Sequence, residues 1–107
     1  MVDSDSQDDS QELRAAAEAL RGHPNVRHLQ LWGRALSDPT RLVIMSLLKA
    51  RGELTGTDLR VALRVSQPAV SQHMALLEDA GFVSSRRRRK WRAYTLRPGA
   101  AALLPDV

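Results

Sequence analysis

The stretch TGTDLRVALRVSQPAVSQHMALL, residues 55–77, predicts two short helices joined by a tight turn. Thr55 and Asp58 match a capping box at the start of the first helix. The second helix opens with Ser66 as an N-cap and Pro68 in its first turn, where a missing N–H costs nothing. Local chemistry therefore defines both helix starts, and the order of the elements predicts a helix-turn-helix.

The second helix has two chemically different faces, because successive side chains turn by about 100°. One face is apolar and predicts core, with a partly buried, hydrogen-bonded histidine: Val70, His73, Met74 and Leu77. The other face carries small residues and neutral amides: Gln67, Pro68, Ser71, Gln72 and Ala75. A solvated helix ordinarily shows Glu and Lys there, whereas Gln and Ser can pair with base edges in a major groove. The candidate base-reading residues are the N-cap Ser66 together with Gln67, Pro68, Ser71 and Gln72, and the alternative is a merely polar surface.

Length and composition limit the classes of protein that fit. A chain of 107 residues with 43% hydrophobic residues can build one modest core, and such a small domain often completes its burial by dimerising. Cysteine is absent, which excludes disulfides, thiolate nucleophiles and cysteine metal sites. We find no secretory signal and no long apolar run, so we expect a soluble cytoplasmic protein without membrane contact. No triad, carboxylate pair or phosphate loop is recognisable, which disfavours an enzyme.

Charge is distributed unevenly along the chain. The first 12 residues hold five acidic residues and no basic one, and we predict that residues 1–10 form a disordered acidic tail. The rest of the chain has 16 basic and 7 acidic residues. A folded part this basic favours a polyanionic partner, and double-stranded DNA is the leading candidate.

A second basic feature follows the helix-turn-helix. Residues 82–85 predict a short strand, and RRRRKWRAYTL, residues 86–96, has the alternation of a second strand, so we predict a β-hairpin. Six basic residues in a run of seven suit DNA phosphates, and the alternative is a solubilising loop. The candidate backbone contacts are Arg86, Arg87, Arg88, Arg89, Lys90 and Arg92. Trp91 either covers the hairpin or stacks near the DNA backbone.

Three further helices are predicted before residue 55. Residues 11–21 and 26–36 carry more apolar surface than one small core can bury, which favours a dimer over packing within one chain. The candidate interface residues are Leu13, Leu20, Leu29 and Trp32. A core helix then starts at Ser37-Asp38-Pro39, with a mostly buried set of Leu42, Ile44, Met45, Leu47 and Leu48. The fold class is therefore mainly α with a small β-hairpin, a dimeric winged helix-turn-helix domain over residues 11–104.

Several blocks of the sequence agree with one family in order and spacing. ALSDPTRLVIMSLL, GELTGTDL and SQPAVSQHMALLEDAGFV, followed by the basic hairpin, resemble the bacterial repressors of the arsenic-and-zinc-sensor (ArsR/SmtB) family. The resemblance covers roughly residues 29–97. It implies a homodimeric transcriptional repressor that binds an inverted-repeat operator and is usually released by an effector. It also places Ser66, Gln67, Ser71 and Gln72 at DNA-reading positions and residues 86–90 on the wing.

The departures from that family concern the effector. Arsenic-type members carry two cysteines where this sequence has Thr55 and Thr57, which are poor ligands for a soft ion. Zinc-type members use ligands on a long C-terminal helix, but no histidine follows His73, and the short C-terminus shifts the expected dimer interface to residues 11–36.

The sequence leaves two candidate routes to regulation: a metal ion bound by histidines, and a partner protein. His23 and His28 are candidate ligands for nickel or zinc, and the alternative is a pair of inert exposed histidines. The competing function is an interaction subunit that needs a co-repressor or sensor protein to bind DNA tightly.

Overall fold

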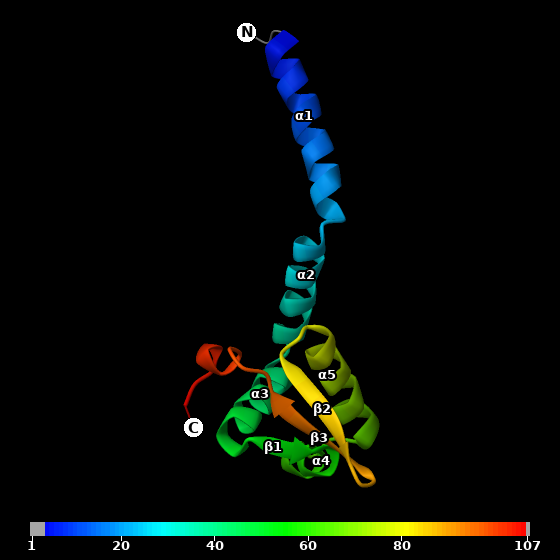
Figure 1. Cartoon of the computed structure of the whole chain (residues 1–107), viewed down its shortest axis with the longest axis vertical. Coiled ribbons are helices and arrows are strands. Elements are labelled where there is room, and N and C mark those ends of the chain that lie inside the picture. Colours follow the sequence, from blue (N-terminus) through cyan, green and yellow to red (C-terminus); the bar gives the residue numbers. More distant parts are fainter. Residues whose placement is uncertain (1–3, 107) are drawn as a thin grey trace. The chain divides into compact units, whose positions relative to one another are not determined.

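The computed structural model describes residues 4–106, and the chain divides into two compact units, Met1–Gln30 and Leu31–Val107 (Figure 1). The first unit contains α1 (Ser4–Arg21) and the first part of α2 (Pro24–Leu36). The two helices are separate, as the Gly-His-Pro sequence between them predicts. Every side chain from residue 9 to residue 30 is exposed, so this stretch has no core of its own.

Helix α1 is longer than predicted. The sequence predicts a start at Gln11, but the helix begins at Ser4, so the disordered tail predicted for residues 1–10 is not found over residues 4–10. Residues 1–3 of that tail lie outside the described residues. The physical reason is that serine and acidic residues, which are typical of disordered tails, are also the residues that a helix N-terminus favours.

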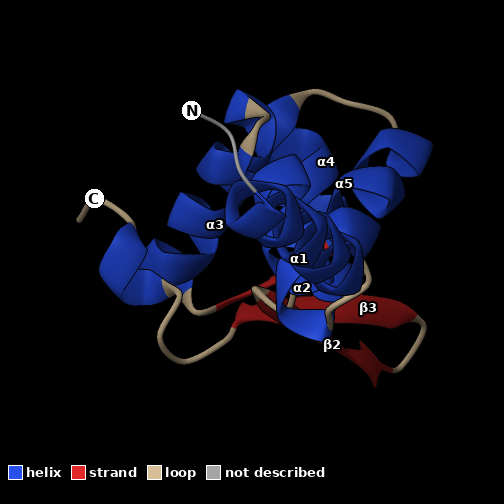
Figure 2. Ribbon diagram, turned by 90° about the horizontal axis from the view of Figure 1, so that it is seen from above, coloured by secondary structure: helices blue, strands red, loops and turns tan. Residues whose placement is uncertain are grey.

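The second unit is a helical layer on a small sheet. After the last turns of α2 come α3 (Pro39–Arg51), β1 (Glu53–Thr55), α4 (Gly56–Leu63), α5 (Gln67–Asp79), β2 (Val83–Arg88), β3 (Trp91–Leu96) and η1 (Ala101–Leu103). The sheet is antiparallel with the order β1-β3-β2, and α3, α4 and α5 lie on one side of the β2–β3 hairpin (Figure 2). The core between them includes Ile44, Met45, Leu48, Leu59, Val70, Met74, Leu77 and Val83. The predicted winged helix-turn-helix is confirmed.

The helix ends follow the local chemistry that predicted them. Thr55 and Asp58 form both bonds of the capping box, with Thr55 N–H donating to Asp58 at 2.9 Å and Asp58 N–H donating to Thr55 Oγ1 at 3.1 Å. The Ser66 hydroxyl caps α5 by accepting from Ala69 N–H at 3.2 Å. Gly81 follows α5 with a φ of 83°, a left-handed conformation that glycine adopts without steric cost.

Strand β1 is missing from the sequence-based prediction. It pairs with β3 through Glu53–Thr95, Leu54–Tyr94 and Thr55–Ala93, which turns the predicted hairpin into a three-stranded sheet. Three residues are too few to show an alternating pattern, and their partners lie about 40 positions later in the chain. The consequence is that the base of the hairpin is fixed to the segment between α3 and α4.

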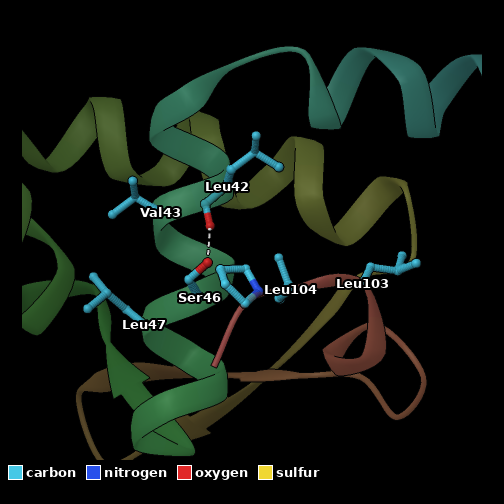
Figure 3. A pocket seen from close by; sticks show the side chains of 7 residues that line it. Leu42, Val43, Ser46, Leu47, Leu103 and Leu104 are labelled. Atoms are coloured by element: carbon cyan, nitrogen blue, oxygen red, sulfur yellow. Dashed lines mark hydrogen bonds between the residues drawn. The ribbon is translucent and has the colours of Figure 1, made fainter. Parts of the chain in front are cut away.

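One predicted core residue lies at the surface instead. The sequence pattern places Leu42 inside α3, but its side chain is 38% exposed, beside Val43 at 48%. Both border an open groove of about 490 Å³ between α3 and the C-terminal segment (Figure 3). Lys49 holds that segment against α3, since its ammonium donates to Leu104 O at 2.8 Å and lies 2.9 Å from Asp106.

No helix within residues 4–106 is long and apolar enough to cross a membrane.

Candidate nucleic-acid interface

The exposed face of α5 is the one that the sequence predicts. Its apolar side, with Val70, Met74 and Leu77, is fully buried against the core. The opposite side is exposed at all five candidate base-reading positions: Ser66, Gln67, Pro68, Ser71 and Gln72. Because the helix is fixed by its buried side, its small and amide-bearing side chains are presented to solvent without competing charges.

Gln67 has a defined place at the start of this face. Its side-chain amide lies over Gly56, the first residue of α4, and a β-carbon on that glycine would stand 3.1 Å from Gln67 Nε2. Gly56 is buried. The missing side chain therefore allows the Gln67 amide to approach the backbone of α4.

The hairpin has a tight tip. β2 and β3 remain paired up to Arg88 and Trp91, so only Arg89 and Lys90 form the turn. Arg89 has a φ of 58°, a backbone conformation that residues other than glycine adopt only at a cost in free energy. This is how the turn closes without an Asn-Gly pair. Lys90 Nζ stands 5.3 Å from the centre of the Trp91 ring, a cation–π contact, and Trp91 itself is 45% exposed.

Glu53 divides the arginines of the hairpin into two groups. Arg86 donates to both oxygens of Glu53, at 2.8 and 3.0 Å, and Arg88 donates to the same carboxylate at 3.3 Å. The hydrogen bonds and charge of Arg86 hold the pKa of the Glu53 carboxyl below its usual value. Two of the six predicted phosphate contacts therefore already have an anionic partner in the protein. The basic hairpin is present as predicted, but the sequence pattern does not show that it is partly neutralised.

Two further arginines of the hairpin, Arg87 and Arg92, donate to neutral oxygens. Arg92 donates to Ser85 Oγ at 2.8 Å, and Arg87 Nε donates to the Arg89 carbonyl at 3.1 Å. All of the basic residues from Arg86 to Arg92 are exposed. The group that is both exposed and without an ion pair within the described residues consists of Arg87, Arg89, Lys90 and Arg92.

A recess lies between the start of α5 and the hairpin. It has a volume of about 350 Å³ and is lined by Gly56, Thr57, Gln67, Lys90, Trp91, Arg92 and Tyr94. Gln67 thus borders the same hollow as two cations and an indole ring. The two features that the sequence predicts separately, an uncharged helix face and a basic hairpin, form one continuous surface.

His73 lies on the inner side of α5, as predicted. It is half-buried, and its Nδ1 atom is 3.2 Å from Nη1 of Arg41. The sequence analysis does not single out Arg41, although its position three residues after the helix cap Asp38 indicates an ion pair at the start of α3.

The predicted dimer residues are mostly exposed. Leu13, Leu20 and Leu29 are 70%, 54% and 60% exposed in the first unit. Trp32 differs, because its ring packs against Phe82 with the centroids 5.3 Å apart, so part of it is covered within its own chain.

The two candidate metal-binding histidines lie on either side of the start of α2. His23 Nδ1 already accepts a hydrogen bond from Asn25 N–H at 3.1 Å, directly before the first turn of that helix. Within the described part of the chain, no group of three or more His, Asp or Glu side chains is placed to hold a metal ion.

Sequence reasoning missed two residues of this surface. Glu53 carries a visible signal, because it is an isolated acid directly after the glycine that ends α3. Gly56 carries none, because its role depends on Gln67 lying over it.

Comparison with known proteins agrees with this architecture. Residues 38–85 match the model of the "Bacterial regulatory protein, arsR family". The arsenical resistance operon repressor of Escherichia coli is 48% identical over 63 residues, 59% of this chain and 54% of the relative. The regulator Rv2034 of Mycobacterium tuberculosis is 45% identical over 74 residues, 68% of each chain.

Solved structures share this fold. HlyU from Vibrio cholerae superposes with a TM-score of 0.65 and 30% identity, covering 76% of this chain and 88% of that one. The chain spans about half the length of the Escherichia coli relative. These two relatives are named as an operon repressor and as a transcriptional regulator. The chain belongs to the ArsR family of DNA-binding transcriptional regulators.

Proposed function

We propose that this chain is a cytoplasmic transcriptional repressor that binds an inverted-repeat operator as a homodimer. The observation that carries the proposal is the recess that joins the start of α5 to the hairpin tip. In this proposal the face of α5 reads bases through Ser66, Gln67, Pro68, Ser71 and Gln72. The wing contacts phosphates, with Arg87, Arg89, Lys90 and Arg92 contributing more than the carboxylate-bound Arg86 and Arg88.

Exposed apolar surface supports the homodimer. The first unit exposes Leu13, Leu20 and Leu29, and the second exposes the groove beside Leu42 and Val43. Apolar patches of this kind on so small a protein are typical of protein interfaces. Two copies would each present one α5, and the half-sites of the operator would then be inverted and about one helical turn, roughly 34 Å, apart.

The test is binding to the DNA upstream of the protein's own coding region. We expect a labelled fragment with an inverted repeat to bind more tightly than a scrambled fragment of the same composition. Insertion of about half a helical turn, roughly 5 bp, between the half-sites should abolish this preference, because the two recognition helices of a dimer reach successive major grooves. Equal binding of repeat and scrambled DNA at one salt concentration would refute a sequence-specific regulator.

The dimer is tested separately. Leu29→Asp should shift sedimentation towards monomer, because a charge in an apolar interface is costly to bury. Arg27→Asp is the matched control, since it adds an acid to the same exposed helix without replacing an apolar residue. A wild-type protein that sediments as a monomer at micromolar concentration would contradict the homodimer.

Regulation has two candidate routes. The Escherichia coli relative is named as an arsenical resistance operon repressor, which favours a metal-type effector, whereas this chain has no cysteine. Nickel or zinc at His23 and His28 would have to replace the Asn25 hydrogen bond. Titration of either ion into the protein–DNA complex should release DNA from the wild type and not from His28→Leu. If neither ion acts, a co-repressor or sensor protein is the second route, and tight binding by the purified protein alone would argue against it.

A further inference from the structure

Arg41 is a buried cation of α3 that contacts two other helices, α2 and α5. It is 7% exposed and lies in the first turn of α3. Its guanidinium donates from Nε to Ala35 O at 2.8 Å and from Nη2 to Arg34 O at 2.9 Å, both in the last turn of α2. Nη1 faces Asp38 at 3.5 Å and His73 Nδ1, in the middle of α5, at 3.2 Å.

The hydrogen bond to His73 has a fixed direction. A guanidinium has donors only, so His73 Nδ1 must be the acceptor and the ring proton must sit on Nε2. His73 stands between the buried Val70 and Met74 on α5, on the side away from the base-reading face. The contact therefore restrains the rotation of α5 about its own axis and its distance from the core, and it does so from the side opposite the base-reading face.

The other bonds of Arg41 fix the guanidinium itself. The last carbonyls of a helix have no partner within the helix, and here the planar fork of Arg41 donates to two of them. The Arg34 carbonyl also accepts from Ser37 Oγ at 2.8 Å. Lysine would keep the charge but could not present several N–H groups in one plane. A buried cation that is held this way leaves His73 little freedom to move relative to the end of α2.

We propose that Arg41 and His73 are positioning residues for base reading: together they fix α5 to the last turn of α2. The inference rests on the proposed function, because it assumes that α5 reads bases. It adds that the operator preference depends on a contact that touches no DNA. It also identifies the path by which a displacement of the end of α2 would reach the recognition helix.

The test compares two substitutions of His73. His73→Leu fills the site but cannot accept a hydrogen bond, whereas His73→Asn places an amide oxygen at the same number of bonds from Cβ as the ring Nδ1. We expect His73→Leu to lose about tenfold in operator affinity, with random DNA changed by less than about twofold. His73→Asn should recover most of the operator affinity. Thermal unfolding measures whether each variant is folded at the binding temperature.

Arg41 supplies the second half of the test. Arg41→Lys alone should lower the ratio of operator affinity to random-DNA affinity. In a protein that already carries His73→Leu it should lower this ratio little further, because both changes break the same interaction. Arg51→Lys is the matched control on the exposed end of the same helix, and it should leave the ratio unchanged. Should His73→Leu fail to fold, His73→Phe keeps an aromatic ring at this position and tests the same removal of an acceptor.

The outcomes separate this inference from the proposed function. Equal losses on operator and random DNA, or additive effects of Arg41→Lys and His73→Leu, would overturn the positioning role while the wild type still prefers its operator. A His73→Asn variant as impaired as His73→Leu would overturn it as well. A wild type without operator preference would refute the proposed function itself.

Discussion

The exposed face of α5 and the hairpin differ in how far their side chains are already paired with other groups of the protein. On that face of α5 the polar side chains of Gln67, Ser71 and Gln72 are exposed, and the hydroxyl of the preceding Ser66 caps the helix. On the hairpin, Arg86 and Arg88 already share the carboxylate of Glu53. A run of basic residues is therefore not a measure of the charge available to a partner. An uncharged face is easier to predict from sequence, because amides and hydroxyls form no ion pairs.

The largest expected effect comes from the hairpin cations that have no carboxylate beside them. Replacing Arg87, Arg89 and Lys90 with alanine should weaken operator and random DNA alike, on the order of a hundredfold at low salt. The slope of log affinity against log salt should become shallower by up to about 0.9 for each phosphate that the hairpin no longer neutralises. Arg97→Ala, just after the end of β3, is the control for a general decrease in positive charge. An unchanged slope would remove the hairpin from the interface.

Gln67→Ala tests the other side of the comparison. It removes a side chain able to make two hydrogen bonds to one base, and we expect a loss of about 1 to 3 kcal/mol on the operator with little change on random DNA. Both affinities are measured at one salt concentration. Equal losses would erase the distinction between a base-reading helix and a phosphate-binding hairpin.

Glu53→Gln should change the DNA affinity of the hairpin in the opposite direction. It removes the carboxylate that holds Arg86 and Arg88, so random DNA should bind roughly threefold to tenfold more tightly and with a steeper salt dependence. Asp79→Asn is the matched control, because it removes an exposed acid from the end of α5 that makes no ion pair with these arginines. If both variants gain equally, net charge and not the release of the two arginines is the cause.

The smallest effect is on stability in acid. The pKa of Glu53 is lowered from 4.5 by Arg86, so near that pH the unfolded chain binds more protons than the folded one. The contribution to the free energy of unfolding is complete above pH 4.5 and is lost as the pH falls through the lower folded value. The free energy of unfolding, measured with urea, should therefore fall less steeply with decreasing pH below 4.5 in Glu53→Gln than in the wild type. Asp38 and Asp106, whose pKa values are also lowered, contribute to the remaining slope.

What the sequence can predict follows from the range of the interactions. The caps at Thr55 and Ser66 join residues three positions apart, and both predictions are confirmed. Helix α5 also shows its buried face through periodicity alone. The resemblance to known repressors adds the order of the elements. These features need no knowledge of distant parts of the chain.

Distant contacts set the limit. Glu53 and Arg86 are 33 residues apart, and Arg41 and His73 are 32 apart, so no local pattern indicates either pair. Leu42 is wrongly predicted as core because α3 is apolar on more than one side, and periodicity cannot tell which apolar side a small domain leaves uncovered. The candidate surface is thus predictable in composition but not in its internal ion pairing.

The placement of the two tryptophans gives the protein a pair of optical reporters. Trp32, near the end of α2, packs against Phe82 with the rings tilted, and Trp91 lies beneath Lys90 at the hairpin tip. Indole emission shifts to shorter wavelength as water is excluded, so the two rings report on different parts of the molecule. Since the chain has no third tryptophan, Trp91→Phe leaves an emission spectrum that belongs to α2 alone. Events at the hairpin and at α2 can therefore be followed by fluorescence without attaching a dye.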